Sequence, residues 1–93
     1  MSLQVSDAVI WQETPEGVSL YNTETGDFRS LNGTGAQIWV LVADDGDRES
    51  VISKLTLWYA GRNAELGGQI RADIDEFIDS MVEGGMLVEA VSV

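Results

Sequence analysis

A crowded group of carboxylates is the feature of this sequence that comes nearest to a catalytic site. Its members are Asp73, Asp75, Glu76 and Asp79. Paired carboxylates can act as general acid and general base when they share a cleft. The chain contains no histidine and no cysteine, however, so it lacks the commonest general base, the commonest metal ligand and any thiol nucleophile. We therefore interpret the carboxylates as the solvated face of a helix, and we predict a protein that is not an enzyme and holds no cofactor and no metal.

Ser80 offers a different chemistry, because Asp79-Ser80-Met81 is similar to the segment of acyl carrier proteins whose serine carries phosphopantetheine. Those proteins place the serine at the start of a helix, with much of the domain after it. Ser80 instead falls inside a predicted helix and close to the end of the chain. We favour a solvated helical serine over a carrier site, and an intact-mass measurement distinguishes the two.

The net charge limits the partners of this chain. It is −11, from 16 acidic and 5 basic residues. Such a surface repels phosphate backbones and anionic lipids and attracts basic groups, so we expect neither nucleic acid nor membrane as a partner. The start of the chain has no positively charged segment and no long apolar run, which predicts a cytoplasmic protein.

Alternating apolar residues predict three strands in the first third of the chain. The strands cover residues 8–12, 18–22 and 27–31, and the turns between them contain proline and glycine. In an antiparallel meander the third strand is an edge, so its unpaired amides and carbonyls could accept an extended peptide as a further strand. An ordinary edge strand packed under a helix is the alternative.

Helical periodicity begins after Asn32, whose side chain we expect to cap a short helix with apolar residues between 36 and 42. Asp47 is the expected cap of a second helix. One apolar face of that helix is predicted from residues at helical spacing, which are Val51, Ile52, Leu55, Trp58 and Tyr59.

A third helix should begin at Leu66 or Gln69 and end at Glu83, before a pair of glycines. Residues 86–88 are expected to pack back onto the core, and residues 89–93 to be loose. The predicted fold class is α+β, with a three-stranded antiparallel sheet followed by three helices (βββααα), similar to a winged helix-turn-helix. We expect one domain over residues 1–93, with its core at about 8–89.

One motif joins the third strand to the first helix. It is Gly26-Asp27-Phe28-Arg29-Ser30-Leu31-Asn32-Gly33-Thr34-Gly35-Ala36-Gln37-Ile38-Trp39. This segment resembles the signature of the PqqD-like proteins, which is roughly Gly-x-aromatic-x-x-Leu-Asn-x-Thr-Gly-x-x-Ile-Trp. The third helix and its Gly85-Met86-Leu87 exit resemble the corresponding part of that family. The chain departs from the family at Arg29, where an aromatic or apolar residue is usual, and at Gly67-Gly68, where helix formers are usual.

The resemblance implies a RiPP recognition element, which binds the leader of a ribosomally synthesised precursor peptide. In that family the leader adds as an antiparallel strand to the third strand and lies in a groove beside the third helix. Carried over to this sequence, the leader-binding residues are Asp27, Phe28, Arg29, Ser30, Leu31, Ile70, Asp73, Ile74 and Phe77. The acidic helix would then pair with lysines or arginines of the leader.

The partner that follows from the resemblance is a separate processing enzyme, and a cysteine leader peptidase of a lasso peptide cluster is the first choice. A pyrroloquinoline quinone-type chaperone that serves a radical enzyme is the alternative, followed by a non-catalytic acyl-carrier-like or scaffolding protein. A DNA-binding winged helix ranks below these, because the third helix has Arg71 alone among acidic residues.

Overall fold

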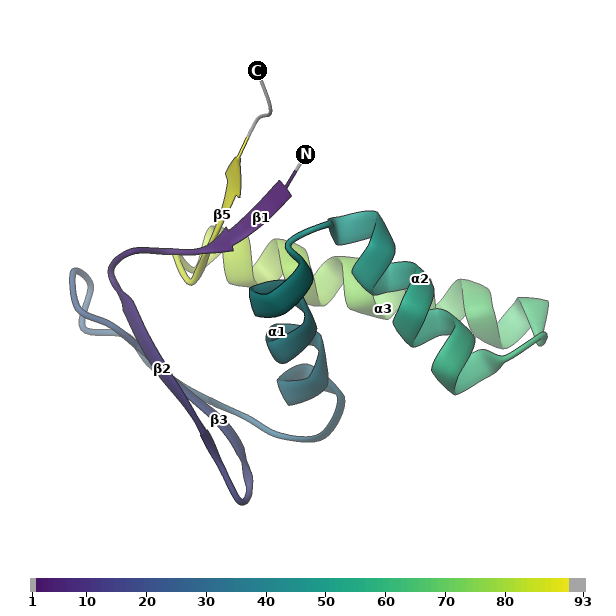
Figure 1. Ribbon diagram of the computed structural model, residues 1–93, viewed down its shortest axis with the longest axis horizontal. Helices are drawn as coiled ribbons and strands as arrows, with labels where there is room; N and C mark the ends of the chain where they lie inside the picture. Colours follow the sequence, from purple (N-terminus) through teal and green to yellow (C-terminus); the bar gives the residue numbers. More distant parts are fainter. Residues whose placement is uncertain (1, 91–93) are drawn as a thin grey trace.

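The computed structural model describes residues 2–90, in which four strands precede three helices and a fifth strand follows them (Figure 1). In chain order the elements are β1 (Ser2–Val5), β2 (Val9–Thr14), β3 (Gly17–Asn22), β4 (Phe28–Leu31), α1 (Gly33–Asp45), α2 (Arg48–Ala60), α3 (Ala64–Glu83) and β5 (Leu87–Ala90). The predicted α+β class and the order of three strands before three helices are confirmed, with a strand added at each end.

The three predicted strands form one antiparallel sheet in the order β2-β3-β4. Val9 pairs with Asn22 on one side of β3, and Val18 pairs with Leu31 on the other. The β2–β3 turn brings Gly17 so close to β4 that a β carbon on Gly17 would overlap the carbonyl oxygen of Leu31. Glycine is therefore required at the corner where the hairpin meets β4.

A second sheet, which no sequence pattern predicted, joins the first and last described segments of the chain. β1 and β5 pair antiparallel from Ser2–Ala90 to Val5–Leu87. The prediction of a loose tail is therefore wrong for Glu89 and Ala90, while residues 91–93 lie outside the described part of the chain. β1 also brings Leu3 into the core, so burial begins before residue 8.

The caps of the helices agree only in part with the predictions. Asp47 caps α2 as expected, because its side chain accepts hydrogen bonds from the amides of Glu49 and Ser50. Asn32 occupies the N-cap position of α1, but its side chain makes no capping bond, so that prediction was wrong. α3 begins at Ala64, ahead of the predicted start, and the side chain of Asn63 caps it.

α2 and α3 approach each other closely at their connected ends. Gly67 is buried, and a β carbon there would lie 3.5 Å from Cγ2 of Thr56 and 3.9 Å from Cβ of Ala60. Gly68 faces open space. The first glycine of the unusual pair therefore lets two helices pack without a gap, which offsets its low helix propensity.

The hydrophobic core lies where α1 meets the sheet and the α2–α3 pair (Figure 1). Trp39 of α1 is fully buried and packs edge to face against Trp11 of β2, with ring centroids 6.1 Å apart. On α2 the predicted apolar face is buried at Val51, Ile52 and Leu55.

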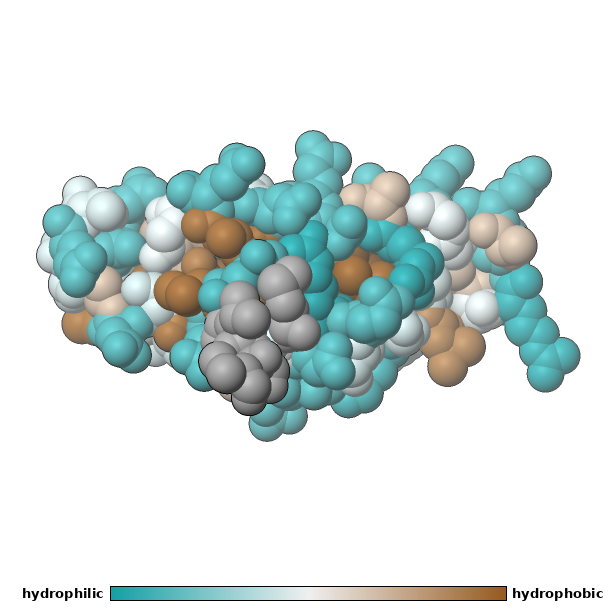
Figure 2. All heavy atoms as spheres, turned by 90° about the horizontal axis from the view of Figure 1, so that it is seen from above, coloured by the Kyte–Doolittle hydropathy of each residue, from teal (hydrophilic) through white to brown (hydrophobic). Residues whose placement is uncertain are grey.

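The α2 prediction was wrong for Trp58, which is 75% exposed, and Tyr59 is also exposed. The far ends of α2 and α3 extend past α1 (Figure 1), so the apolar face of α2 continues beyond the elements that could cover it. The molecule is thin, with extents of 41 × 38 × 19 Å. Seen from above, its surface is mainly hydrophilic with separate apolar areas (Figure 2).

Asn22 is the buried polar side chain that connects the sheet to the end of α3. Its Nδ2 donates to the carbonyl of Gly85 at 3.0 Å, and its Oδ1 accepts from the amides of Glu24 and Thr25. Every polar atom of this amide is thus satisfied inside the fold.

We expect Asn22→Leu to lower the free energy of unfolding by about 2–3 kcal/mol, because it leaves a carbonyl and two amides without partners. Asn22→Asp keeps the acceptor and removes the donor, so it should fall between the leucine variant and the wild type. Urea unfolding followed by circular dichroism measures both. Equal midpoints for Asn22→Leu and the wild type would show that these hydrogen bonds contribute nothing.

Candidate functional site

The outer edge of β4 is free in the part of the chain that the structure describes, because β4 pairs only with β3. The amide of Asn22 donates to the carbonyl of Asp27, which marks a hydrogen-bonded pair directly before β4. Hydrogen-bonded and non-hydrogen-bonded pairs alternate along an antiparallel ladder. Arg29 and Leu31 therefore bond to β3, whereas the backbone amides and carbonyls of Phe28 and Ser30 point toward the free edge.

Four of the five residues 27–31 that were predicted to bind a peptide lie on β4 and are divided between two faces of the sheet. Arg29 and Leu31 lie opposite the buried Leu20 and Val18 and therefore share the core-facing side. Phe28 and Ser30 lie on the opposite side, which we call the outer face, and Phe28 is 62% exposed there. Asp27 precedes β4, and its carboxylate lies 3.3 Å from Nε of Arg29.

Arg29 lies over the C-terminal end of α3. A β carbon on Gly84 would collide with its guanidinium group. A cation is favourable at this end of a helix, and Asp27 supplies a second favourable contact. The arginine is thus accommodated at the β4–α3 contact, where its long side chain takes the space that a side chain at position 84 would need.

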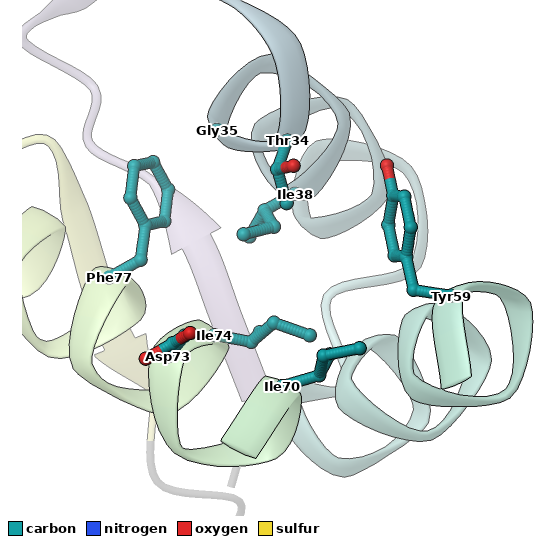
Figure 3. A pocket seen from close by; sticks show the side chains of 8 residues that line it. All are labelled: Thr34, Gly35, Ile38, Tyr59, Ile70, Asp73, Ile74 and Phe77. Carbon is teal, nitrogen blue, oxygen red and sulfur yellow. The ribbon is translucent and has the colours of Figure 1, made fainter. Parts of the chain in front are cut away.

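An apolar cavity of about 480 Å³ lies between α1, α3 and the end of α2 (Figure 3). Its lining residues are Thr34, Gly35, Ile38, Tyr59, Ile70, Asp73, Ile74 and Phe77. Figure 3 shows the three isoleucines pointing into the cavity, with Phe77 and Tyr59 at its opposite ends.

All four predicted α3 residues line this cavity, but the residues contributed by the other helices were missed. The resemblance implies a groove between the third strand and the third helix, whereas no residue of β4 lines the cavity itself. Thr34, Gly35 and Ile38 come from α1 and Tyr59 comes from α2. The signal that could have indicated the α1 residues is the Thr-Gly-x-x-Ile part of the motif.

Gly35 connects the cavity to β4. The segment Gly33-Thr34-Gly35 is the first turn of α1. A β carbon on Gly35 would lie 3.3 Å from the ring of Phe77 and 4.0 Å from Cβ of Leu31. The missing side chain lets Phe77 lie against α1 directly beside the end of β4, so the free edge and the cavity adjoin.

The acidic group on α3 does not form a catalytic pair. Asp75 and Asp79 bind the guanidinium of Arg48 at 2.6 and 2.7 Å, and Glu89 of β5 binds it at 3.0 Å. Partial burial alone would lower the pKa of Arg48, but its hydrogen bonds to Asp79 and Asp75 outweigh this effect and raise the pKa above its usual value. These carboxylates therefore hold α2, α3 and β5 together.

Asp73 is the one carboxylate among the cavity-lining residues, and Glu76 does not line the cavity. Two carboxylates do not converge there, so the geometry offers no acid–base pair. Among residues 2–90 no group of three or more acidic side chains is placed to hold a metal ion. Ser80 lies inside α3, exposed, with its carbonyl accepting from the amide of Gly84, as expected for an ordinary helical serine.

No helix within the described residues combines the length and the apolar character needed to cross a bilayer.

A free strand edge beside an apolar cavity is typical of domains that bind an extended peptide as an additional strand. The family model described as coenzyme PQQ synthesis protein D (PqqD) matches residues 17–87. The protein therefore belongs to the PqqD family and is a PqqD-like RiPP recognition element.

Two solved structures share this fold. The first is described as TbiB1 in complex with the TbiA(beta) leader peptide, with a TM-score of 0.80 and 20% identity over 96% of this chain and 99% of that chain. The second is described as lasso peptide synthetase B1 complexed with the leader peptide, with a TM-score of 0.78 and 22% identity over 96% of this chain and 100% of that chain. A comparison with curated proteins found no match.

Proposed function

We propose that this protein binds the leader region of a ribosomally synthesised precursor peptide as an additional strand on β4. The observation that carries this proposal is the position of the free edge, at which the backbone groups of Phe28 and Ser30 point outward beside the apolar cavity. Main-chain hydrogen bonds along β4 give affinity that is independent of sequence, and the cavity adds selectivity for side chains. Leader peptides named in the descriptions of both similar structures support this choice of ligand.

The protein acts by binding and does no chemistry of its own. Holding the leader raises the effective concentration of the precursor near a separate processing or modifying enzyme. A cysteine leader peptidase of a lasso peptide cluster is the partner we propose first, because the similar structures include a lasso peptide synthetase B1.

We also propose that the fold is related to winged helix-turn-helix domains, and that its three helices support a peptide site and not a DNA site. Arg71, the basic residue of α3, is paired with Glu49 and is not presented to a phosphate backbone.

A pyrroloquinoline quinone-type chaperone is the second candidate, and the family description favours it. In that case the same edge would hold the precursor for a radical enzyme and not for a peptidase. Titration with synthetic leaders of both classes separates the two candidates, because the cavity side chains must fit one leader better than the other.

Hydrogen exchange tests the proposed edge. A cognate leader should slow exchange of the Phe28 and Ser30 amides, which point outward, far more than exchange of Arg29 and Leu31, which already bond to β3. Uniform protection of the whole sheet, or none, would contradict strand addition at β4.

Asp73 is expected to select a basic leader residue, because it is the carboxylate that faces the cavity. Asp73→Asn should weaken binding of a leader that contains lysine or arginine by roughly three- to tenfold at low salt, and the loss should shrink as salt increases. Glu76→Gln is the matched control, since it removes the same charge from the same helix outside the cavity. Equal losses in the two variants would indicate a general charge effect without a contact at Asp73.

A further inference from the structure

Three exposed apolar side chains form a continuous row across the outer face of the sheet. Ile10 pairs with Tyr21, and Tyr21 pairs with Phe28, so the three positions lie side by side on adjacent strands. Their exposed fractions are 66%, 42% and 62%, respectively. We call Ile10, Tyr21 and Phe28 the outer row, and it borders a shallow cavity of about 230 Å³.

The next row on the same face has the opposite character. Gln12 pairs with Ser19, and Ser19 pairs with Ser30, so this row is polar on every strand. A solvated face of an antiparallel sheet is normally polar throughout. The outer row is therefore an apolar exception on a face that is expected to be polar. It ends at Phe28, on the strand with the free edge.

We infer that the outer row contacts a side chain of the bound peptide, so that the protein recognises both faces of the added strand. This inference rests on the proposed addition of a leader to β4. Because the backbone of Phe28 points to the free edge, an antiparallel peptide residue directly opposite Phe28 would exchange hydrogen bonds with it. The side chain of that residue then lies on the outer face about 5 Å from Phe28, measured between β carbons.

The chemistry of that leader side chain follows from its neighbours. Beside Phe28 the row favours an apolar or aromatic side chain, which would extend the row from three strands to four. Two leader residues away, the side chain beside Ser30 continues the polar row, so a small or polar residue is favoured there. The intervening leader residue points to the opposite face of the sheet, on the side of Arg29 and Leu31.

The test compares leader affinities of folded variants by fluorescence anisotropy. Phe28→Ser should weaken leader binding roughly three- to tenfold, because it removes the cross-strand contact and leaves the backbone of β4 unchanged. Trp58→Ser is the matched control, since Trp58 is also an exposed aromatic residue but lies on α2, away from the sheet, and the leader affinity of this variant should equal that of the wild type. An alanine scan of the leader should reveal one apolar position at which alanine lowers the affinity for the wild-type protein. The same alanine substitution should not lower the affinity for Phe28→Ser.

Other outcomes overturn the inference in distinguishable ways. Unchanged affinity in Phe28→Ser together with lost affinity in Ser30→Pro would retain strand addition and refute contact with the outer row. If Phe28→Ser binds the leader with unchanged affinity but the partner enzyme processes the precursor more slowly, the outer row would instead be a docking site for that enzyme. A concentration-dependent dimer that Phe28→Ser abolishes, with leader affinity unchanged, would assign it to self-association. Failure of the wild type to bind any leader would refute the proposed function and the inference with it.

Discussion

Ser30→Pro should abolish leader binding while the domain stays folded. The amide of Ser30 points to the free edge, so proline removes a donor that the sheet itself does not use. The proline ring also obstructs the approach of a neighbouring strand. Loss of this one main-chain hydrogen bond costs roughly 1 kcal/mol, and the obstruction should weaken the neighbouring bonds by at least as much, so we expect at least about 30-fold weaker binding. Anisotropy with a labelled leader measures the loss, and circular dichroism reports the fold.

Two neighbouring substitutions make this experiment specific. Ser30→Ala keeps the amide and removes only the hydroxyl, so its leader affinity should stay within about twofold of the wild type. Arg29→Pro removes an amide that bonds to Leu20, so it should destabilise the sheet itself. Wild-type affinity in folded Ser30→Pro would contradict either strand addition at β4 or the register derived for it.

Trp39→Ala should cause the largest loss of stability, about 3–5 kcal/mol. Trp39 is fully buried at the contact between α1 and the sheet and packs edge to face against Trp11. A cavity of indole size at this position cannot be filled by movement of one element. Thermal unfolding should show a melting temperature lower by roughly 15 °C or more, or no cooperative transition.

Trp39→Phe is the control for ring packing. The indole Nε1 has no hydrogen-bond partner among the described residues, so phenylalanine loses ring area and no hydrogen bond. Its destabilisation should be well under half that of the alanine variant. Leu31 is only partly buried, so Leu31→Ala should be milder than Trp39→Ala. A Trp39→Ala protein as stable as the wild type would show that burial of Trp39 does not stabilise the fold.

The sequence allowed prediction of the elements that depend on local patterns. Alternation around Val18 and Leu20 indicated the central strand, and both residues are fully or nearly fully buried. Val51, Ile52 and Leu55 indicated the buried face of α2, and Asp47 indicated its cap. Each signal comes from neighbouring residues, so no knowledge of distant contacts was needed.

The missed features depend on contacts between distant segments. The pairing of β1 with β5 joins the ends of the chain, and neither four-residue segment carries a strong strand signal alone. Arg48 connects to Asp75, Asp79 and Glu89, none of which lies near it in the sequence. Periodicity predicted that Trp58 is buried, but burial also requires an element to cover it, and α1 does not reach that far along α2.

The candidate site shows the same division. Helical spacing correctly groups Ile70, Ile74 and Phe77, which all line the cavity. The contribution of Gly35 depends on an absent side chain beside Phe77, and Tyr59 is joined to α1 by a hydrogen bond from its hydroxyl to Gln37. The division of β4 into a core-facing side and an outer face follows from strand alternation, but which residues face the core became clear only from the register with β3.

The most direct test of the central claim is a titration of this protein against a labelled leader peptide encoded beside its gene, followed by fluorescence anisotropy, with a scrambled leader as control. We expect saturable binding of the native leader with a dissociation constant of about 1 µM or lower, and much weaker binding of the scrambled peptide. Absence of saturable binding to any neighbouring leader by well-folded protein would contradict a leader-binding function.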